Sequence, residues 1–189
     1  MPEPPTTIAV RVRPAVHRDA AAMRDLLEEL GYPMSADEVH ARLRVLTAEP
    51  ATKLMVAEHE DRVVGIAVLH WFELLERPGS FSRLLALVVT DDHRGQGVGR
   101  QLVEACENIA RKNGSLGLEV TSAPHREDAD AFYQELGFVA GASRYYRKTF
   151  AAGKGATRGE PTSQVAGASP GPASLERTGI PEQEGERRD

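Results

Sequence analysis

Glycines that alternate between two arginines form the most chemically suggestive stretch of the sequence. The candidate anion-binding residues are Arg94, Gly95, Gln96, Gly97, Val98, Gly99 and Arg100. A helix N-terminus offers backbone N–H groups that lack internal acceptors and lie at the positive end of the helix dipole. Glycines let a ligand approach that backbone closely. Such a stretch at the start of a helix suits the binding of phosphate or pyrophosphate. The alternative interpretation is an ordinary helix N-terminus that follows a flexible loop and binds no ligand.

The flanking residues predict a strand before the glycines and a helix after them. Residues 84–89 are a short apolar run rich in branched side chains, which indicates a buried strand. Apolar residues then recur every three or four positions over 98–111, which predicts an amphipathic helix. Gly114 follows a basic last turn and is typical of a helix stop. The glycines therefore lie at the N-terminus of the predicted helix.

Several phosphate-binding loops share this general arrangement, and the spacing separates them. The nucleoside triphosphate loop G-x-x-x-x-G-K-[ST] does not occur in the sequence. The dinucleotide fingerprint G-x-G-x-x-G fits poorly, because Arg100 occupies its third glycine position. Glu119 lies about where that fingerprint has its ribose-binding acid, so an NAD-dependent oxidoreductase stays open as an alternative.

Two motifs resemble those of the GCN5-related N-acetyltransferase (GNAT) family. The stretch Arg94-Gly95-Gln96-Gly97-Val98-Gly99 is similar to its R/Q-x-x-G-x-G/A signature. Residues 129–138, with Ala129, Phe132-Tyr133 and Leu136-Gly137-Phe138, are similar to its A-x-x-F-Y-x-x-L-G-F motif. The motifs occur in the family's order, and the resemblance covers residues 8–150.

This resemblance implies an α/β fold with a single mixed sheet flanked by helices. Its fourth and fifth strands would splay apart and hold acetyl-CoA between them as co-substrate. Main-chain groups of Leu87, Val88 and Val89 would bind the pantetheine and the acetyl carbonyl, and residues 94–100 would bind the pyrophosphate. The implied reaction moves an acetyl group from the thioester to a primary amine of a small molecule or protein, by direct attack in a ternary complex.

The resemblance places Tyr133 near the leaving thiolate. A phenol has a pKa of about 10 and a thiol of about 8.5, so complete proton transfer is uphill by roughly 2 kcal/mol. Tyr133 is therefore expected to donate a hydrogen bond that strengthens as charge develops on sulfur. A tyrosine packed in the core of a short helix is the alternative interpretation.

The general base is harder to identify. Many family members carry a glutamate two residues before the position of Leu87, and this chain has Leu85 there. Glu119 and Glu73 are the remaining acids expected near the cleft, and either could act through water. Each is also explained as a solvated surface acid, and an amine could lose its proton to bulk water. Leu85 keeps open a non-catalytic module that binds or senses CoA.

The resemblance also implies where the acceptor amine binds. The first two helices and the loop before the fourth strand, residues 18–46 and 72–82, would form the pocket. Candidate residues for contact with a cationic amine are Glu28, Glu29, Tyr32, Trp71 and Glu73.

Composition narrows the class of protein. With 189 residues and 41% hydrophobic content, the chain can form one globular domain. The net charge of -5 argues against nucleic-acid binding. The single cysteine excludes an internal disulfide. The metal-binding pattern H-E-x-x-H does not occur, and no apolar run is long enough to span a membrane. We expect a cytoplasmic protein without metal, and the resemblance allows a homodimer.

Periodicity and turn signals divide the chain into three parts. Residues 1–7 are expected to be a flexible lead, 8–150 the acetyltransferase-like domain, and 151–189 a disordered tail rich in Gly, Pro and charged residues. Within the domain, strands are expected at 8–14, 53–59, 63–72, 84–89, 116–121, 138–140 and 144–150. Helices are expected at 16–30, 35–49, 98–111 and 127–136.

Overall fold

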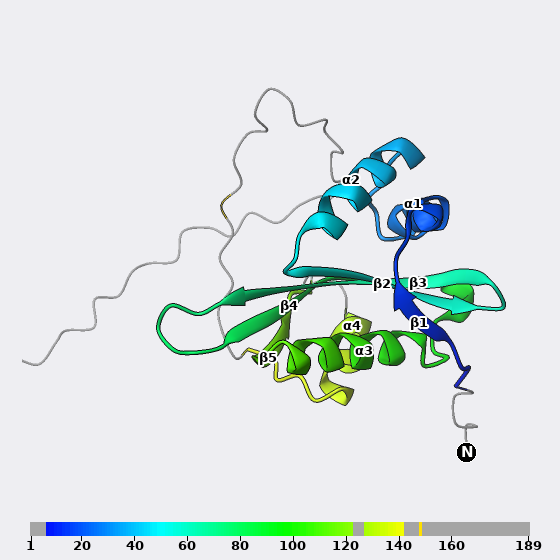
Figure 1. The fold of residues 1–189 in the computed structure, drawn as a ribbon. Helices are drawn as coiled ribbons and strands as arrows, with labels where there is room; N and C mark the ends of the chain where they lie inside the picture. Colours follow the sequence, from blue (N-terminus) through cyan, green and yellow to red (C-terminus); the bar gives the residue numbers. More distant parts are fainter. Residues whose placement is uncertain (1–6, 123–126, 142–147, 149–189) are drawn as a thin grey trace, which may run out of the picture.

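The computed structural model describes residues 7–122, 127–141 and 148. The elements in chain order are β1 (Arg11–Pro14), η1 (His17–Asp19), α1 (Ala20–Glu29), α2 (Ala36–Ala48), β2 (Thr52–His59), β3 (Arg62–Glu73), β4 (Ser80–Val89), η2 (Asp91–His93), α3 (Val98–Lys112), β5 (Ser115–Val120) and α4 (Glu127–Glu135). Figure 1 shows their arrangement.

One mixed sheet with strand order β1-β2-β3-β4-β5 forms the centre of the fold. The strands from β1 to β4 pair antiparallel, whereas β5 runs parallel to β4. The helices α1 and α2 lie on one face of the sheet, and α3 and α4 lie on the other (Figure 1). This arrangement confirms the predicted α/β fold with a single mixed sheet flanked by helices.

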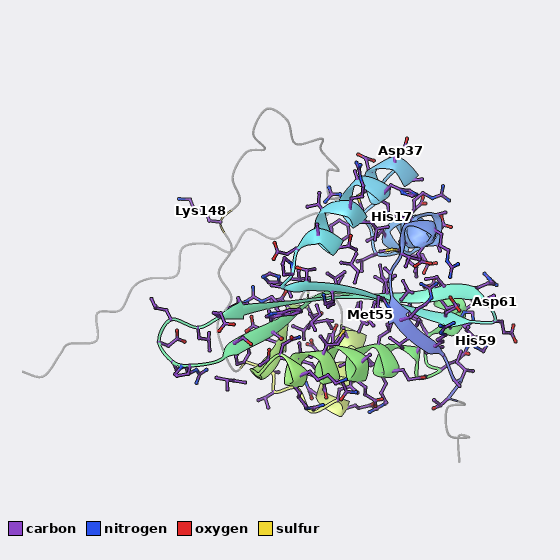
Figure 2. All side chains as sticks on the ribbon, in the orientation of Figure 1. His17, Asp37, Met55, His59, Asp61 and Lys148 are labelled. Carbon is purple, nitrogen blue, oxygen red and sulfur yellow. The ribbon has the colours of Figure 1, made fainter. Side chains whose placement is uncertain are left out.

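Local sequence signals explain several element boundaries. The β2–β3 hairpin turns through Glu60 and Asp61, which both have positive φ, and Asp61 lies at its tip (Figure 2). Positive φ at both central residues matches the right-handed twist of the strands. At the start of α2, Ser35 Oγ accepts from the Glu38 N–H at 3.3 Å, and the Glu38 carboxylate accepts from the Ser35 N–H at 2.8 Å. This capping box is the one that the sequence predicts.

Two apolar clusters attach the helices to the sheet. One lies between the sheet and α1 and α2 and includes Leu26, Leu43 and Ile66, all fully buried. The other lies between the sheet and α3 and includes Leu69 and Leu102, both 0% exposed. Burying one such side chain contributes roughly 1.5–3 kcal/mol. The clusters fix the helix α3, and hence the glycine loop before it, against the sheet.

The first strand is shorter than the sequence predicts. β1 begins at Arg11, not at residue 8. The main chain before it bonds to the glycine loop and to α3, and its contact with β2 is through the His59 ring, whose Nδ1 lies 3.2 Å from the Ala9 carbonyl. The Ile8 N–H donates to the Gln96 carbonyl at 3.1 Å, and the Gln101 side chain accepts from the Val10 N–H at 3.2 Å and donates to the Ile8 carbonyl at 2.7 Å.

β4 is longer than predicted, because it begins at Ser80 and not at residue 84. Ser80 and Ser82 are buried, and their hydroxyls lie 3.0 and 2.6 Å from the hydroxyl of Ser115 on β5. Hydrogen bonding between the hydroxyls removes the cost of burying them. Serines in the core of a strand do not give the apolar pattern on which the prediction depended.

The chain after α4 departs from the prediction in one place. Residues 138–140 form no strand within the described part of the chain. Their predicted partner, residues 144–150, lies outside the described residues except for Lys148. The predicted N-terminal lead (apart from Thr7) and the predicted tail lie outside the described residues as well.

None of the helices in the described ranges is long and apolar enough to cross a membrane. Within those ranges, no three His, Cys, Asp or Glu side chains gather as a metal ion would require.

Candidate active site

β4 and β5 separate halfway along β4. Their last paired residues are Leu84 and Val120, the last residue of β5, so residues 86–89 pair with β3 alone and Leu85 pairs with neither strand. The edge of residues 85–89 that faces away from β3 therefore has no strand partner among the described residues. Leu87, Val88 and Val89, the residues predicted to bind the acyl chain, all lie on this open edge. This open edge agrees with the splay that the family resemblance implies, since the pairing of β4 with β5 ends at Leu84 and Val120.

A β-bulge marks the start of the open segment. The register between β3 and β4 shifts between Val68 and Leu69, whose partners are Ala86 and Leu84, so Leu85 is the extra residue. A bulge bends a strand and increases its twist, and this one lies directly after the last β4–β5 pair. The Leu85 side chain is 54% exposed. The position where many relatives have an acid therefore carries an apolar side chain on a bend.

The glycine loop lies directly beyond the open edge and leads into α3. Gly95 and Gly97 have φ of 71° and 78°, in the left-handed region that favours glycine. The N–H groups of residues 95–100 find no acceptor among the described residues. α3 begins at Val98, and the N–H groups in the first turn of a helix have no carbonyl acceptor within that helix. The loop therefore presents the unused main-chain donors on which the sequence-based prediction of an anion site depends.

Contacts from three sides hold this loop in place. The Gln96 side-chain amide donates to the Asp92 carbonyl at 2.8 Å. The main chain at Ile8 bonds to Gln96 as described above. A Cβ on Gly97 would lie 2.8 Å from Thr7 Cγ2, so the N-terminal segment packs closely on the loop. The donors are therefore preorganised.

The two arginines at the ends of the loop are only partly available to a ligand. Arg94 donates through Nε to the Val89 carbonyl at 3.1 Å and pairs with Asp91 at 2.5 Å and with Glu29 at 3.8 Å. Arg100 lies 3.6 Å from Glu135 of α4. Since these pairs are exposed, each is worth little by itself. The main-chain donors, and not the arginines, are the strongest feature of the loop.

The second motif packs against the first. A Cβ on Gly99 would lie 3.2 Å from Phe132 Cζ, so glycine lets α4 approach the start of α3. The Tyr133 ring is half-buried and makes edge contacts with Phe132 and Phe138, at centroid distances of 5.2 and 5.4 Å. Tyr133 therefore lies on the α3 side of the sheet, with the apolar cluster that includes Leu87 and Val89.

Of the two candidate acids, Glu119 lies at the apex of the splay. It is the register partner of Arg83, one pair before the strands separate. Its carboxylate forms an ion pair with the Arg83 guanidinium, which also lies over the Phe72 ring. The carboxylate is thus placed beside the site but is already engaged. Arg83 has no sequence signal of its own, because its partner is far along the chain.

Glu73 lies at the other end of the sheet. Its register partner is Ser80, the first residue of β4. The seven residue-to-residue steps from Ser80 to Leu87 span roughly 23 Å along a strand. The structure does not bring Glu73 close to the open edge of β4.

An apolar cavity of about 320 Å³ lies on the opposite face of β4 from α3. The helices α1 and α2 and the segment between them form its roof, and Leu85 and Ala86 belong to its β4 wall. Of the residues expected to contact an amine, only Tyr32 lines it. Glu29 is turned to Arg94, and Trp71 lies under the Lys53 ammonium at 5.8 Å.

Comparison with known proteins agrees with this geometry. A model of the Acetyltransferase (GNAT) family matches residues 20–138. The chain is 31% identical over 113 residues to aminoalkylphosphonate N-acetyltransferase of Salmonella typhimurium, covering 60% of this chain and 71% of that protein. It is 27% identical over 124 residues to IAA acetyltransferase of Azospirillum brasilense, covering 62% and 77%.

A solved acetyltransferase from Trypanosoma brucei has a similar fold, with a TM-score of 0.64 and 25% identity over 75% of this chain and 100% of that one. The family model spans more than half of the sequence and includes the strand, the glycine loop and the α4 motif. The chain therefore belongs to the GNAT family of acetyltransferases.

Proposed function

We propose that this protein is an acetyl-CoA-dependent N-acetyltransferase that acetylates a primary amine of a small molecule or protein. The observation that carries the proposal is the succession of two sets of main-chain groups that lack a main-chain partner among the described residues. The open edge of β4 at residues 85–89 runs directly into the donors of residues 95–100. An extended amide-bearing chain that ends in a pyrophosphate matches that combination of groups.

In this proposal each segment binds one part of the co-substrate. The main chain of Leu87, Val88 and Val89 orients the pantetheine arm and polarises the acetyl carbonyl. The loop from Arg94 to Arg100 binds the pyrophosphate, chiefly through its N–H groups. Donors fixed before the reaction need no rearrangement when charge develops in the transition state.

Tyr133 is proposed to donate its hydroxyl proton in a hydrogen bond to the leaving thiolate. Its ring is held by Phe132 and Phe138, which restricts its rotamers. Tyr133→Phe should lower kcat by about 100-fold, as loss of a transition-state donor does in other enzymes. The affinity for CoA, measured by calorimetric titration, should stay within a factor of two or so of the wild-type value, since ring packing is kept.

We propose that the amine attacks the thioester directly in a ternary complex. A route through an acetylated cysteine would need Cys106, the one cysteine of the chain. That side chain is 0% exposed within α3, and burial raises the pKa of its thiol to about 12. A protonated, enclosed thiol is a poor nucleophile.

The general base that would deprotonate the amine is the part of the proposal that the fewest contacts support. Glu119 is the better placed of the two candidate acids, because it lies at the apex of the splay. Since Arg83 engages its carboxylate, Glu119 would accept the proton through a water on its remaining lone pairs. Glu73 would need a longer relay, and deprotonation in bulk water requires neither acid. Pre-steady-state pH profiles of Glu119→Gln and Glu73→Gln separate these routes.

The first experiment is calorimetric titration of the purified protein with CoA and, separately, with NAD. We expect CoA to bind and NAD not to bind. Acetylation of a library of primary amines, followed through release of free thiol, then tests turnover. If CoA binds but no amine is acetylated, the chain is a CoA-binding or CoA-sensing module. If NAD binds and CoA does not, the assignment of the glycine loop is wrong.

A further inference from the structure

The apolar cavity beneath α1 and α2 reaches the point where acetyl transfer would occur. Leu85 and Ala86, which form part of its wall, are the first β4 residues beyond the last β4–β5 pair. An acceptor in this cavity would thus lie on the opposite face of β4 from α3. Its amine could reach the acetyl group at Leu85 and Ala86, because β5 no longer pairs with β4 there and does not close the gap.

One charged side chain lines this cavity, and it is a cation. Arg42 of α2 lines the cavity and is exposed, so it lies at the rim. It forms no ion pair or hydrogen bond with any described residue. Glu38, one turn earlier on the same helix, accepts hydrogen bonds from Ser35 at 2.8 and 2.9 Å. These bonds lower the pKa of Glu38, and the charge of Arg42 adds a smaller contribution without a direct contact.

The remaining lining side chains disfavour binding of a polycation in the cavity. Apart from Arg42 and the phenol of Tyr32, which is 52% exposed, all of them are apolar. No carboxylate of a described residue lines the cavity. Polyamines and other substrates with several positive charges would therefore be repelled by Arg42 and would meet no carboxylate in the described lining.

A guanidinium that makes no hydrogen bond or ion pair with any described residue, beside an apolar wall, favours one kind of ligand. Its planar donors match a carboxylate, phosphate or phosphonate in two-point geometry. Partial removal of water by the apolar wall strengthens such a pair relative to one on an open surface. The apolar wall in turn favours an aliphatic or aromatic body between the acid and the amine.

We propose that the acceptor is an apolar amine that carries an acidic group, and that Arg42 binds this group while the amine lies at Leu85 and Ala86. The proposal rests on the acetyltransferase function proposed above. It makes Arg42 a specificity-determining residue and assigns no role to it in the chemical step.

Matched amines that differ by one carboxylate test the selectivity of the wild-type protein. One pair is 4-(aminomethyl)benzoate and benzylamine, and the other is L-phenylalanine and 2-phenylethylamine; spermidine serves as the polycation. We expect the acidic member of at least one pair to have a kcat/KM about 10-fold to 100-fold higher, the range for a hydrogen-bonded charge pair. Equal or lower values for the acidic member of both pairs, or a preference for spermidine, would overturn the proposal.

Variants on α2 then test whether Arg42 is responsible. Arg42→Gln should lose the preference for the acidic member, chiefly through a higher KM, and Arg42→Lys should keep part of it. Arg44→Gln removes the same charge from an exposed position of the same helix that does not line the cavity, and should keep the preference. A preference that survives in Arg42→Gln would contradict the assignment.

A binding measurement separates failure of this inference from failure of the proposed function. Calorimetric titration of 4-(aminomethyl)benzoate into the wild-type protein and into Arg42→Gln reports recognition of the acid without turnover. If CoA binds and amines are acetylated without regard to the carboxylate, this inference alone fails. If no amine is acetylated but 4-(aminomethyl)benzoate binds only in the presence of Arg42, the proposed function fails and recognition of the acid stands.

Discussion

Replacing Gly97 by alanine perturbs the proposed pyrophosphate loop at its most constrained residue. Gly97 has φ of 78°, and its left-handed conformation directs the N–H groups on either side of it. Alanine pays about 1–2 kcal/mol for that conformation. The added Cβ would also lie 2.8 Å from Thr7 Cγ2, a distance that requires the N-terminal segment to move.

The magnitude follows from the population of the competent loop. If the strain drives the loop out of its binding conformation, ligand binding must restore it, and the apparent affinity falls by the fraction that is competent. A strain of 1–2 kcal/mol corresponds to about a 5-fold to 30-fold higher Kd for CoA. The displacement of Thr7 adds to this loss, so we expect the upper part of that range.

The assay is calorimetric titration with CoA, and Gly114 provides a matched control. Gly114 has φ of 72°, and a Cβ there would meet nothing within 4 Å. It follows the 15-residue helix α3, about 22 Å from the loop. Gly114→Ala should therefore lower the free energy of unfolding by about 1–2 kcal/mol but leave the Kd for CoA unchanged. Wild-type affinity in Gly97→Ala, or an equal loss in Gly114→Ala, would refute the reasoning.

Three further predictions concern stability and reactivity. Arg13→Met should lower the free energy of unfolding in urea by about 3–5 kcal/mol, because it strands the carboxylates of Asp19 and Glu58, which are 4% and 15% exposed. Burial raises the pKa of Asp19, but hydrogen bonds from Arg13 and from the Val16 N–H outweigh it and leave the pKa below its ordinary value. The bridge therefore stabilises the fold above about pH 4 and loses its effect as the pH falls further, and urea midpoints should depend less on acid pH in Arg13→Met than in the wild type. Burial raises the pKa of Cys106 to about 12, so a thiol reagent should label it only at the rate of unfolding; rapid labelling of the native protein would contradict this burial.

Much of the fold could be predicted from local patterns. The capping box at Ser35 and Glu38, the apolar run before the glycines and the face of α3 are all properties of neighbouring residues, and the structure has each of them. Predictions failed where a residue's partner is distant. The residues at Ile8 and Val10 look like a strand, but they bond to Gln101, which is remote in the sequence.

The candidate site divides in the same way. The donors of the glycine loop follow from glycines placed before a helix, which is a local signal. The bulge at Leu85 depends on how β3 and β4 align, and no residue type in the sequence predicts its position. Likewise, only the register of β4 with β5 places Arg83 beside Glu119, and only the packing of α2 brings Arg42 to the cavity.

Because β5 does not pair with β4 beyond Leu84, the second half of β4 is an edge strand although β4 lies inside the sheet order. Residues 85–89 have one row of main-chain groups without a strand partner in the described part of the chain, and of these the Val89 carbonyl accepts from Arg94 Nε. A ligand with amides of its own would act as the missing strand and complete the sheet. Binding and folding are then coupled: at a ligand concentration 100 times Kd the native state gains about 2.7 kcal/mol. The amides of this segment that do not pair with β3 should accordingly exchange faster with solvent hydrogen in the free protein than in the presence of such a ligand. Under the proposed function, the co-substrate would be a structural element of the enzyme as well as its acetyl donor.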